Sequence, residues 1–191
     1  RETYGGLHKK YGVEPDMAMY GKALGNGYAI TAIIGRREIM ESAQNSFISS
    51  TFWTERIGPT AGLKTLEIME REKSWELITE QGNSIKRGWQ KLSEKYGVKI
   101  NIGGLAALST FSFVGEKGLI YKTYLSQRML EKGYLAGTSC YLSIYHTKDI
   151  INNYLTEMEE IFERISKCEK EGTTNGLLDG PVCHTTFKRL N

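Results

Sequence analysis

Cysteine is scarce in this sequence, and its scarcity excludes two kinds of small protein. The 191 residues include three cysteines, an odd number without Cys-x-x-Cys spacing, so neither a disulfide framework nor a zinc site is expected. The three histidines, His8, His146 and His184, are far apart in the sequence and form no metal-ligand spacing. We therefore expect no metal site and a reduced, cytoplasmic protein.

Long hydrophobic runs and a strong net charge are missing as well. No apolar run approaches the roughly 18 residues that a membrane helix needs, and no signal peptide is visible at the Arg-Glu-Thr-Tyr start. The formal net charge of +3 is too small and too scattered to indicate a nucleic acid partner. Hydrophobic residues make up 40% and charged residues 25%, which is typical of a globular chain with a real core.

What the sequence does contain is a lysine set among glycines between two apolar runs. Residues 17–20 end at Gly21, Lys22 follows at once, and a β-rich run spans residues 30–34. Apolar runs of this length, bounded by glycines, indicate buried strands, so we expect Lys22 on a loop between two strands. A lysine amine that such a loop desolvates and aims can attack a carbonyl carbon. The alternative is an ordinary solvated lysine, which is what most lysines are.

A second group of polar side chains, Ser49, Ser50 and Thr51, comes before a segment with helical periodicity. Hydroxyls and backbone amides ahead of a helix can hold a phosphate group, because the unpaired N–H groups and the helix dipole favour an anion. Serine and threonine are also preferred N-caps, so ordinary helix capping is the alternative, and spacing alone favours it.

Two neighbouring stretches resemble a known family. Gly-Val-Glu-Pro-Asp (12–16), followed by Gly-Lys-Ala-Leu-Gly-Asn-Gly (21–27), is similar to the lysine segment of class III, or ω-type, pyridoxal-phosphate aminotransferases, and especially to the glutamate-1-semialdehyde aminomutase-like branch. The likeness extends to about residue 170. It implies the α/β fold of type I pyridoxal-phosphate-dependent transferases, which is aspartate-aminotransferase-like. The chain would then be the C-terminal portion of a longer enzyme.

The same resemblance implies a domain layout and a set of site residues. Residues 1–72 would complete the large cofactor-binding domain, and residues 73–191 would form the small C-terminal α/β domain with its tail. Lys22 would be the Schiff-base lysine of pyridoxal 5'-phosphate and the base that moves the substrate α-proton. The segment 50–53, Ser-Thr-Phe-Trp, resembles the family's phosphate loop, so Thr51, with Ser50 beside it, would bind the cofactor phosphate of the neighbouring subunit.

These implications describe an aminotransferase that acts on an amine donor and a carbonyl acceptor, as a homodimer with shared active sites. Two other functions stay open. Glutamate-1-semialdehyde 2,1-aminomutases carry a glutamate near the start of the segment that here spans residues 137–143, whereas this chain has Thr138 at the matching place. The third possibility is that the isolated chain is an inactive fragment or a dimerisation module.

The rest of the sequence predicts helices alternating with strands. Apolar residues at helical spacing predict helices over residues 36–42, 57–71, 74–96, 119–132 and 150–170, with Thr147 as N-cap of the last. Strands are expected over residues 98–102, 108–114 and 141–145. This alternation favours an α/β or α+β sandwich. The tail, residues 172–191, is expected to pack peripherally, with Arg189 pairing a substrate carboxylate as the less favoured alternative.

Overall fold

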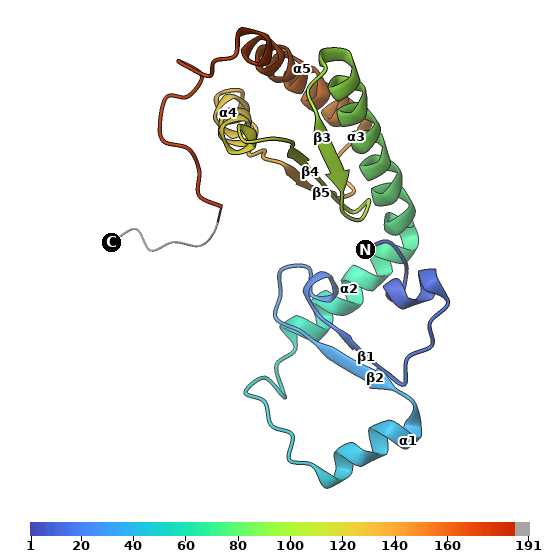
Figure 1. Ribbon diagram of the computed structural model, residues 1–191. Helices are drawn as coiled ribbons and strands as arrows, with labels where there is room; N and C mark the ends of the chain where they lie inside the picture. The colour runs from blue at the N-terminus through green and yellow to red at the C-terminus, as the bar shows by residue number, and fades with distance from the viewer. Residues whose placement is uncertain (186–191) are drawn as a thin grey trace. The chain divides into compact units, whose positions relative to one another are not determined.

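A computed structural model describes residues 1–185 and divides the chain into two compact units (Figure 1). Unit 1 comprises residues 1–77 and unit 2 begins at Ile78, so the division falls inside one helix. The domain boundary after residue 72 stays a prediction, and Arg189 lies outside the described residues. Among residues 1–185, no helix combines the length and apolar character that a membrane crossing requires.

Unit 1 is built on a two-stranded antiparallel sheet. Strand β1 (Met17–Tyr20) pairs with β2 (Ala32–Gly35), with Met17 opposite Gly35. The 3-10 helix Lys22–Leu24 lies in the loop that joins them, as expected for a loop between two strands. The other elements of this unit are the 3-10 helices Leu7–Tyr11 and Glu41–Asn45 and the α-helices α1 (Arg37–Met40) and α2 (Ile57–Glu72).

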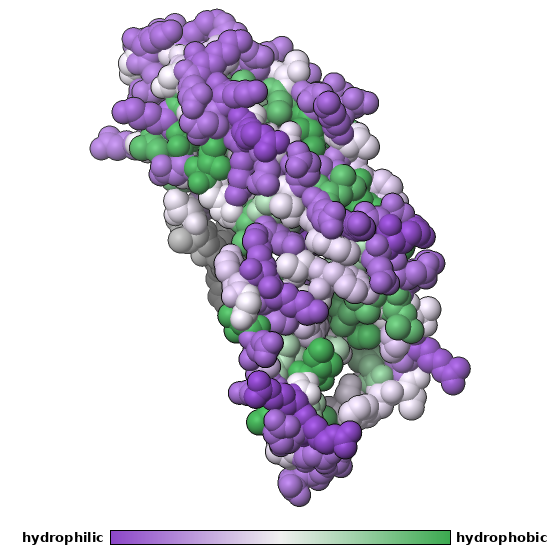
Figure 2. All heavy atoms as spheres, turned by 90° about the vertical axis from the view of Figure 1, so that its right-hand side faces the viewer, coloured by the Kyte–Doolittle hydropathy of each residue, from purple (hydrophilic) through white to green (hydrophobic). Residues whose placement is uncertain are grey.

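The prediction that β1 and β2 are buried is wrong for the described chain. Met19 is 75% exposed, Ile33 52% and Ile34 56%. Two paired strands leave one open edge each and cannot bury both faces of their sheet. Hydrophobic side chains accordingly reach the molecular surface between hydrophilic ones (Figure 2).

Unit 2 is an antiparallel three-stranded sheet that shares one core with three helices. The strands β3 (Ile100–Gly103), β4 (Leu108–Phe113) and β5 (Ser139–Tyr141) lie in the order β3-β4-β5. The helices are α3 (Ser74–Tyr96), α4 (Gly118–Glu131) and α5 (Lys148–Glu171). Alternate residues of β4 are buried, which places its two phenylalanines on the same face.

Aromatic rings from all three helices α3, α4 and α5 pack against those two phenylalanines. The ring of Trp89 from α3 lies 4.7 Å from that of Phe111. The ring of Phe113 lies 5.8 Å from Tyr121 of α4 and 5.9 Å from Phe162 of α5. Tilted and edge-on ring pairs at these distances contribute about 0.5–1.5 kcal/mol each beyond the area they bury, so they hold the three helices to one sheet face.

The predicted helices are confirmed, but one predicted strand is wrong. Helix α3 begins and ends where the periodicity predicted, and the Thr147 side chain caps α5 by accepting the Ile150 N–H at 3.4 Å. The strand expected over residues 141–145 ends at Tyr141. Its β-rich pattern is overridden by a turn, because the ring of His146 accepts the backbone N–H of Ser143 at 3.0 Å.

Gly82 sets how closely α3 approaches the segment before β4. A Cβ atom at this position would lie 1.9 Å from the carbonyl oxygen of Ala106. We expect Gly82→Ala to lower the midpoint of thermal unfolding by roughly 2–12 °C, because overpacking costs about 1–3 kcal/mol even though alanine is the better helix former. Gly137→Ala is the matched control, since its Cβ would meet nothing nearer than 3.7 Å. An unchanged midpoint for Gly82→Ala would contradict the close approach.

Candidate functional site

Lys22 is held in an unusual backbone conformation. Its φ of 46° lies in the left-handed region, which residues other than glycine rarely adopt. Gly21 enters the turn with an extended backbone, and the Asn26 N–H donates to the Lys22 carbonyl oxygen at 3.1 Å. Such a conformation costs about 1–3 kcal/mol and persists only where its surroundings fix it, which happens most often at functional sites.

The amine of Lys22 is unpaired. The side chain is exposed, and within residues 1–185 it forms no hydrogen bond or ion pair. Neighbouring cations are different: Arg36 pairs with Asp16 at 3.0 Å and Lys10 with a Glu2 carboxylate at 2.6 Å. An unpaired primary amine on a fixed backbone suits a group that carries a carbonyl, so the chemistry of this side chain fits pyridoxal phosphate.

The loop that carries Lys22 lies against α2 at two glycines one helical turn apart. A Cβ at Gly58 would lie 2.5 Å from the carbonyl oxygen of Ala29, and one at Gly62 would lie 3.5 Å from the side chain of Ile30. Both glycines are buried. Residues four apart share one face of a helix, so α2 presents a flat strip to the loop and supports it. The Gly-x-x-x-Gly spacing inside a helical segment was the available signal for this close approach.

The far side of the lysine loop closes on itself. A Cβ at Gly25 would lie 2.0 Å from the carbonyl oxygen of Tyr28, and the Tyr28 N–H donates to the Gly25 carbonyl at 3.1 Å. Gly27 follows with a φ of 110°, a conformation that favours glycine. The glycines after Lys22 are therefore required by the fold of the loop itself.

Ser50 and Thr51 lie in the irregular segment before α2, and both are exposed. The Ser50 hydroxyl oxygen accepts the Phe52 N–H at 3.2 Å, which closes a local turn. In the described part of the chain, no hydrogen bond joins either residue to Lys22. Their proposed contact with a cofactor phosphate stays a prediction.

The N-terminus of α2 is capped by Glu55, not by Ser50 or Thr51. The carboxylate of Glu55 accepts the backbone N–H groups of Ile57 and Gly58, the second at 2.9 Å. A negative charge at this end of the helix is also favoured by the helix dipole. The interpretation of Ser50 and Thr51 as helix caps is therefore wrong, and Glu55 already occupies two of the N–H groups that could have bound an anion.

Lys22 is exposed at the surface of the described chain. A concavity of about 630 Å³ lies along the hairpin, but its walls include neither Lys22 nor Thr51. Residues 1–185 contain no cluster of three histidine, cysteine or acidic side chains that could hold a metal ion. The concavity is lined by residues that include His8, Lys9, Pro15, Ala18, Tyr20 and Arg36.

Comparison with known sequences identifies a family and its members. The family model for class-III aminotransferases matches residues 3–168. The 3-aminobutyryl-CoA aminotransferase of Cloacimonas acidaminovorans (strain Evry) is 31% identical over 174 residues, which cover 84% of this chain and 42% of that protein. A glutamate-1-semialdehyde 2,1-aminomutase of Persephonella marina is 29% identical over 182 residues, covering 86% and 42%. The chain thus spans less than half the length of these curated relatives.

Solved structures share the fold over a similar extent. A transaminase with PLP bound superposes with a TM-score of 0.76 at 18% identity and covers 87% of this chain and 42% of its own. An omega-transaminase from Sphaerobacter thermophilus gives a TM-score of 0.75 at 16% identity, covering 87% and 42%. At sequence identities this low, the similarity supports the fold alone. It confirms the α/β architecture predicted from the sequence.

The two glycines of α2 provide a matched pair of variants. We expect Gly58→Ala to reduce the free energy of unfolding by about 1–3 kcal/mol and to speed hydrogen exchange at the Leu24, Asn26 and Tyr28 amides, because its Cβ would displace the loop. Gly62→Ala adds a Cβ at an ordinary contact distance, so it should leave exchange unchanged. Equal exchange rates in the two variants would show that α2 does not position the lysine loop.

Proposed function

Because the chain belongs to the class-III aminotransferase family, we propose that it is the C-terminal part of a fold type I aminotransferase that depends on pyridoxal 5'-phosphate. Residues 1–72 belong to its large domain and residues 73–191 form its small one. The observation that carries the proposal is the unpaired amine of Lys22 on a strained, glycine-rich loop supported by α2. Lys22 holds the cofactor covalently through Nζ.

Lys22 has two tasks in this proposal. When bound, pyridoxal phosphate supplies a sink for the electrons released as a bond to the substrate α-carbon breaks. The Nζ of Lys22 would take the proton from that carbon and return it at another position. The left-handed backbone fixes the direction in which the side chain leaves the loop, so less orientational freedom is lost when the amine acts.

Thr51 and Ser50 form the second part of the proposed site. They lie in an exposed turn, where a group from outside unit 1 can reach their hydroxyls. We propose that Thr51, with Ser50 beside it, binds the phosphate of the cofactor held by the partner subunit of a homodimer. A hydroxyl that donates to a phosphate dianion makes a charge-assisted bond, which is stronger than a bond between neutral groups. The substrates are an amine donor and a carbonyl acceptor.

An aminomutase is the second candidate function. It is favoured by the relatives named glutamate-1-semialdehyde 2,1-aminomutase, which are 26–29% identical to this chain. Thr138 counts against it, because the resemblance places a glutamate there in the mutases. The test is an assay of the full-length protein with an added amine and pyruvate, and separately with glutamate-1-semialdehyde. Amino transfer to pyruvate without isomerisation of glutamate-1-semialdehyde would support the aminotransferase and exclude the aminomutase. Because the chain spans only about two fifths of the length of its relatives, we expect little activity from the isolated chain.

The assignment of Lys22 is tested by chemical mapping. Borohydride reduction of the cofactor-loaded, full-length protein should leave the pyridoxyl group on the peptide that contains Lys22. Lys22→Arg should abolish turnover, because a guanidinium is too basic and has the wrong geometry to bond the cofactor carbonyl. Lys73→Arg is the matched control and should leave turnover unchanged, since Lys73 has the same left-handed φ of 46° but no role in the proposal. A label on another lysine, or turnover in Lys22→Arg, would remove Lys22 from the mechanism.

The contribution of Thr51 is tested across the dimer. Thr51→Ala should weaken cofactor affinity by one to two decades, because a hydrogen bond to a charged group contributes about 1.5–3 kcal/mol. Thr54→Ala, in the same exposed turn, should leave affinity unchanged. Heterodimers of Thr51→Ala and Lys22→Ala subunits should bind the cofactor with unaltered affinity at one of their two sites, since that site carries neither change. If that site instead shows the weakened affinity of Thr51→Ala, in heterodimers of verified composition, the sites are not shared.

A further inference from the structure

The segment that follows α5 folds back along α4 instead of leaving unit 2 (Figure 1). Helix α5 ends at Gly172, whose φ of 71° turns the chain. We call residues 173–185 the strap. The family match ends at residue 168, so the strap lies beyond the part that this chain shares with the family model.

The strap has one apolar anchor. Leu177 is 2% exposed and belongs to the core cluster of unit 2, and Leu178 packs against the same cluster. A turn presents this anchor: the Leu177 N–H donates to the Thr174 carbonyl at 3.2 Å, and Gly176 has a φ of 70°. Full burial of a leucine side chain is a substantial stabilising contribution, so Leu177 holds the strap on the unit.

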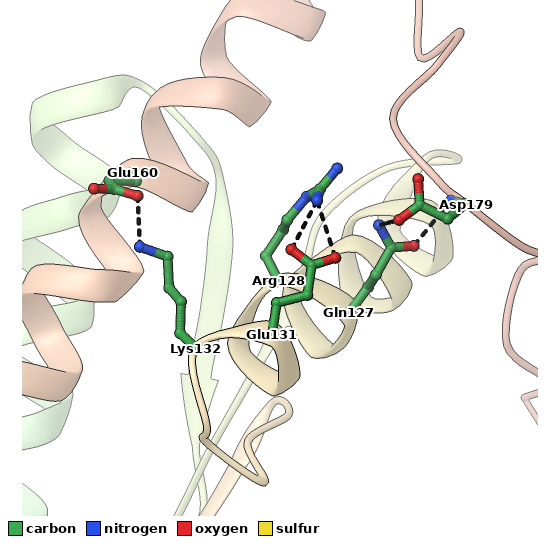
Figure 3. A network of polar contacts seen from close by, with 6 residues as sticks. All are labelled: Gln127, Arg128, Glu131, Lys132, Glu160 and Asp179. Atoms are coloured by element: carbon green, nitrogen blue, oxygen red, sulfur yellow. Dashed lines mark hydrogen bonds and ion pairs between the residues drawn. The ribbon is translucent and has the colours of Figure 1, made fainter.

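Two polar contacts continue along α4. The Gln127 amide pairs twice with Asp179: its Nε2 donates to Oδ2 at 2.6 Å, and its Oε1 accepts the Asp179 N–H at 3.0 Å (Figure 3). Further along, the Thr123 hydroxyl oxygen accepts the Cys183 N–H at 3.0 Å. Thr123 and Gln127 are one turn apart on the same face of α4, so the strap follows the axis of that helix.

The charges near Asp179 favour the docked position. The Arg128 guanidinium donates to Glu131 at 2.8 Å (Figure 3). The pKa of Arg128 is raised, mainly by this hydrogen bond to Glu131 and also, to a smaller extent, by the negative charge of Asp179. The strap carboxylate therefore lies close enough to a cation of α4 to be attracted by it.

We propose that the strap is a conformational device that docks on unit 2 through Leu177 in the core and through two hydrogen-bonded points on α4, and that it opens as one unit while the helices remain folded. In this proposal only these three contacts hold the strap, and the backbone can pivot at Gly172 and Gly176. The helices and the sheet keep their own hydrogen bonds and aromatic core when the strap leaves, so its opening requires much less free energy than global unfolding. Opening uncovers the apolar seat of Leu177 and exposes the half-buried Cys183.

Hydrogen exchange of the full-length protein tests this device directly, because the Asp179 and Cys183 amides both donate to side chains of α4. The two amides should show similar protection, at least tenfold above an unstructured peptide and well below the amides inside α4. Leu177→Ala should speed both by at least tenfold while α4 exchange stays slow. Asn175→Ala, an exposed change in the same strap, should leave both rates unchanged.

A substitution outside the core provides a second test in case the Leu177→Ala protein does not fold. Gln127→Ala should speed exchange at Asp179, whereas Lys122→Ala, an exposed change on the same helix, should not. Alkylation of Cys183 should accelerate in the same variants that speed exchange. Peptide-like exchange at Asp179 and Cys183 in the unaltered protein would show that the strap is undocked. Exchange in step with α4 would show that it opens only on global unfolding, and either result overturns the proposal.

Discussion

Both units depend on a helix that approaches a neighbouring backbone more closely than any side chain allows. In unit 1, Gly58 of α2 faces the carbonyl of Ala29, where a Cβ would lie 2.5 Å away. In unit 2, Gly82 of α3 faces the carbonyl of Ala106, where a Cβ would lie 1.9 Å away. Interiors packed at crystal-like density transmit such displacements, so these two positions set where the attached loops lie.

The proposed site follows from the first of these contacts. The loop between β1 and β2 is held by α2 on one side and by its own glycine turn on the other, and Lys22 is fixed in a left-handed conformation between them. The two strands that this loop joins expose large apolar side chains, among them Met19 and Ile33. Exposed apolar surface of this kind is typically covered by further protein, which agrees with a chain that spans about two fifths of its relatives.

Unit 2 is stabilised differently. Its sheet buries one face against three helices through aromatic rings gathered around Phe111 and Phe113, and this core does not depend on the lysine loop. The strap adds Leu177 to the same core from beyond the end of the family match. A segment with few anchors on a well-packed core can open without unfolding what lies beneath it, and the proposed opening of the strap rests on this property.

The sequence by itself determined the helices, the family and the place of Lys22. Helical periodicity is a local property, since residues four apart meet whatever the rest of the chain does, and so α3 was predicted to its ends. The lysine between glycines was visible for a similar reason, because apolar runs and glycines mark strands and turns locally. Its likeness to the class III lysine segment then led to the family that the comparisons show.

Only the tertiary structure decided what those local elements contact. The carboxylate of Glu55, not Ser50 or Thr51, caps α2, because the chain brings it within reach of the helix N–H groups. The ring of His146 ends β5 by taking a backbone N–H that a longer strand would have left for pairing. The backbone strain of Lys22 and the docking of the strap on Gln127 likewise depend on residues brought together by folding. The pairing of Gln127 with Asp179 joins residues 52 apart in the sequence, and no periodicity records it. The Glu55 and His146 contacts span only three residues, but each depends on a turn that helical or strand periodicity does not encode.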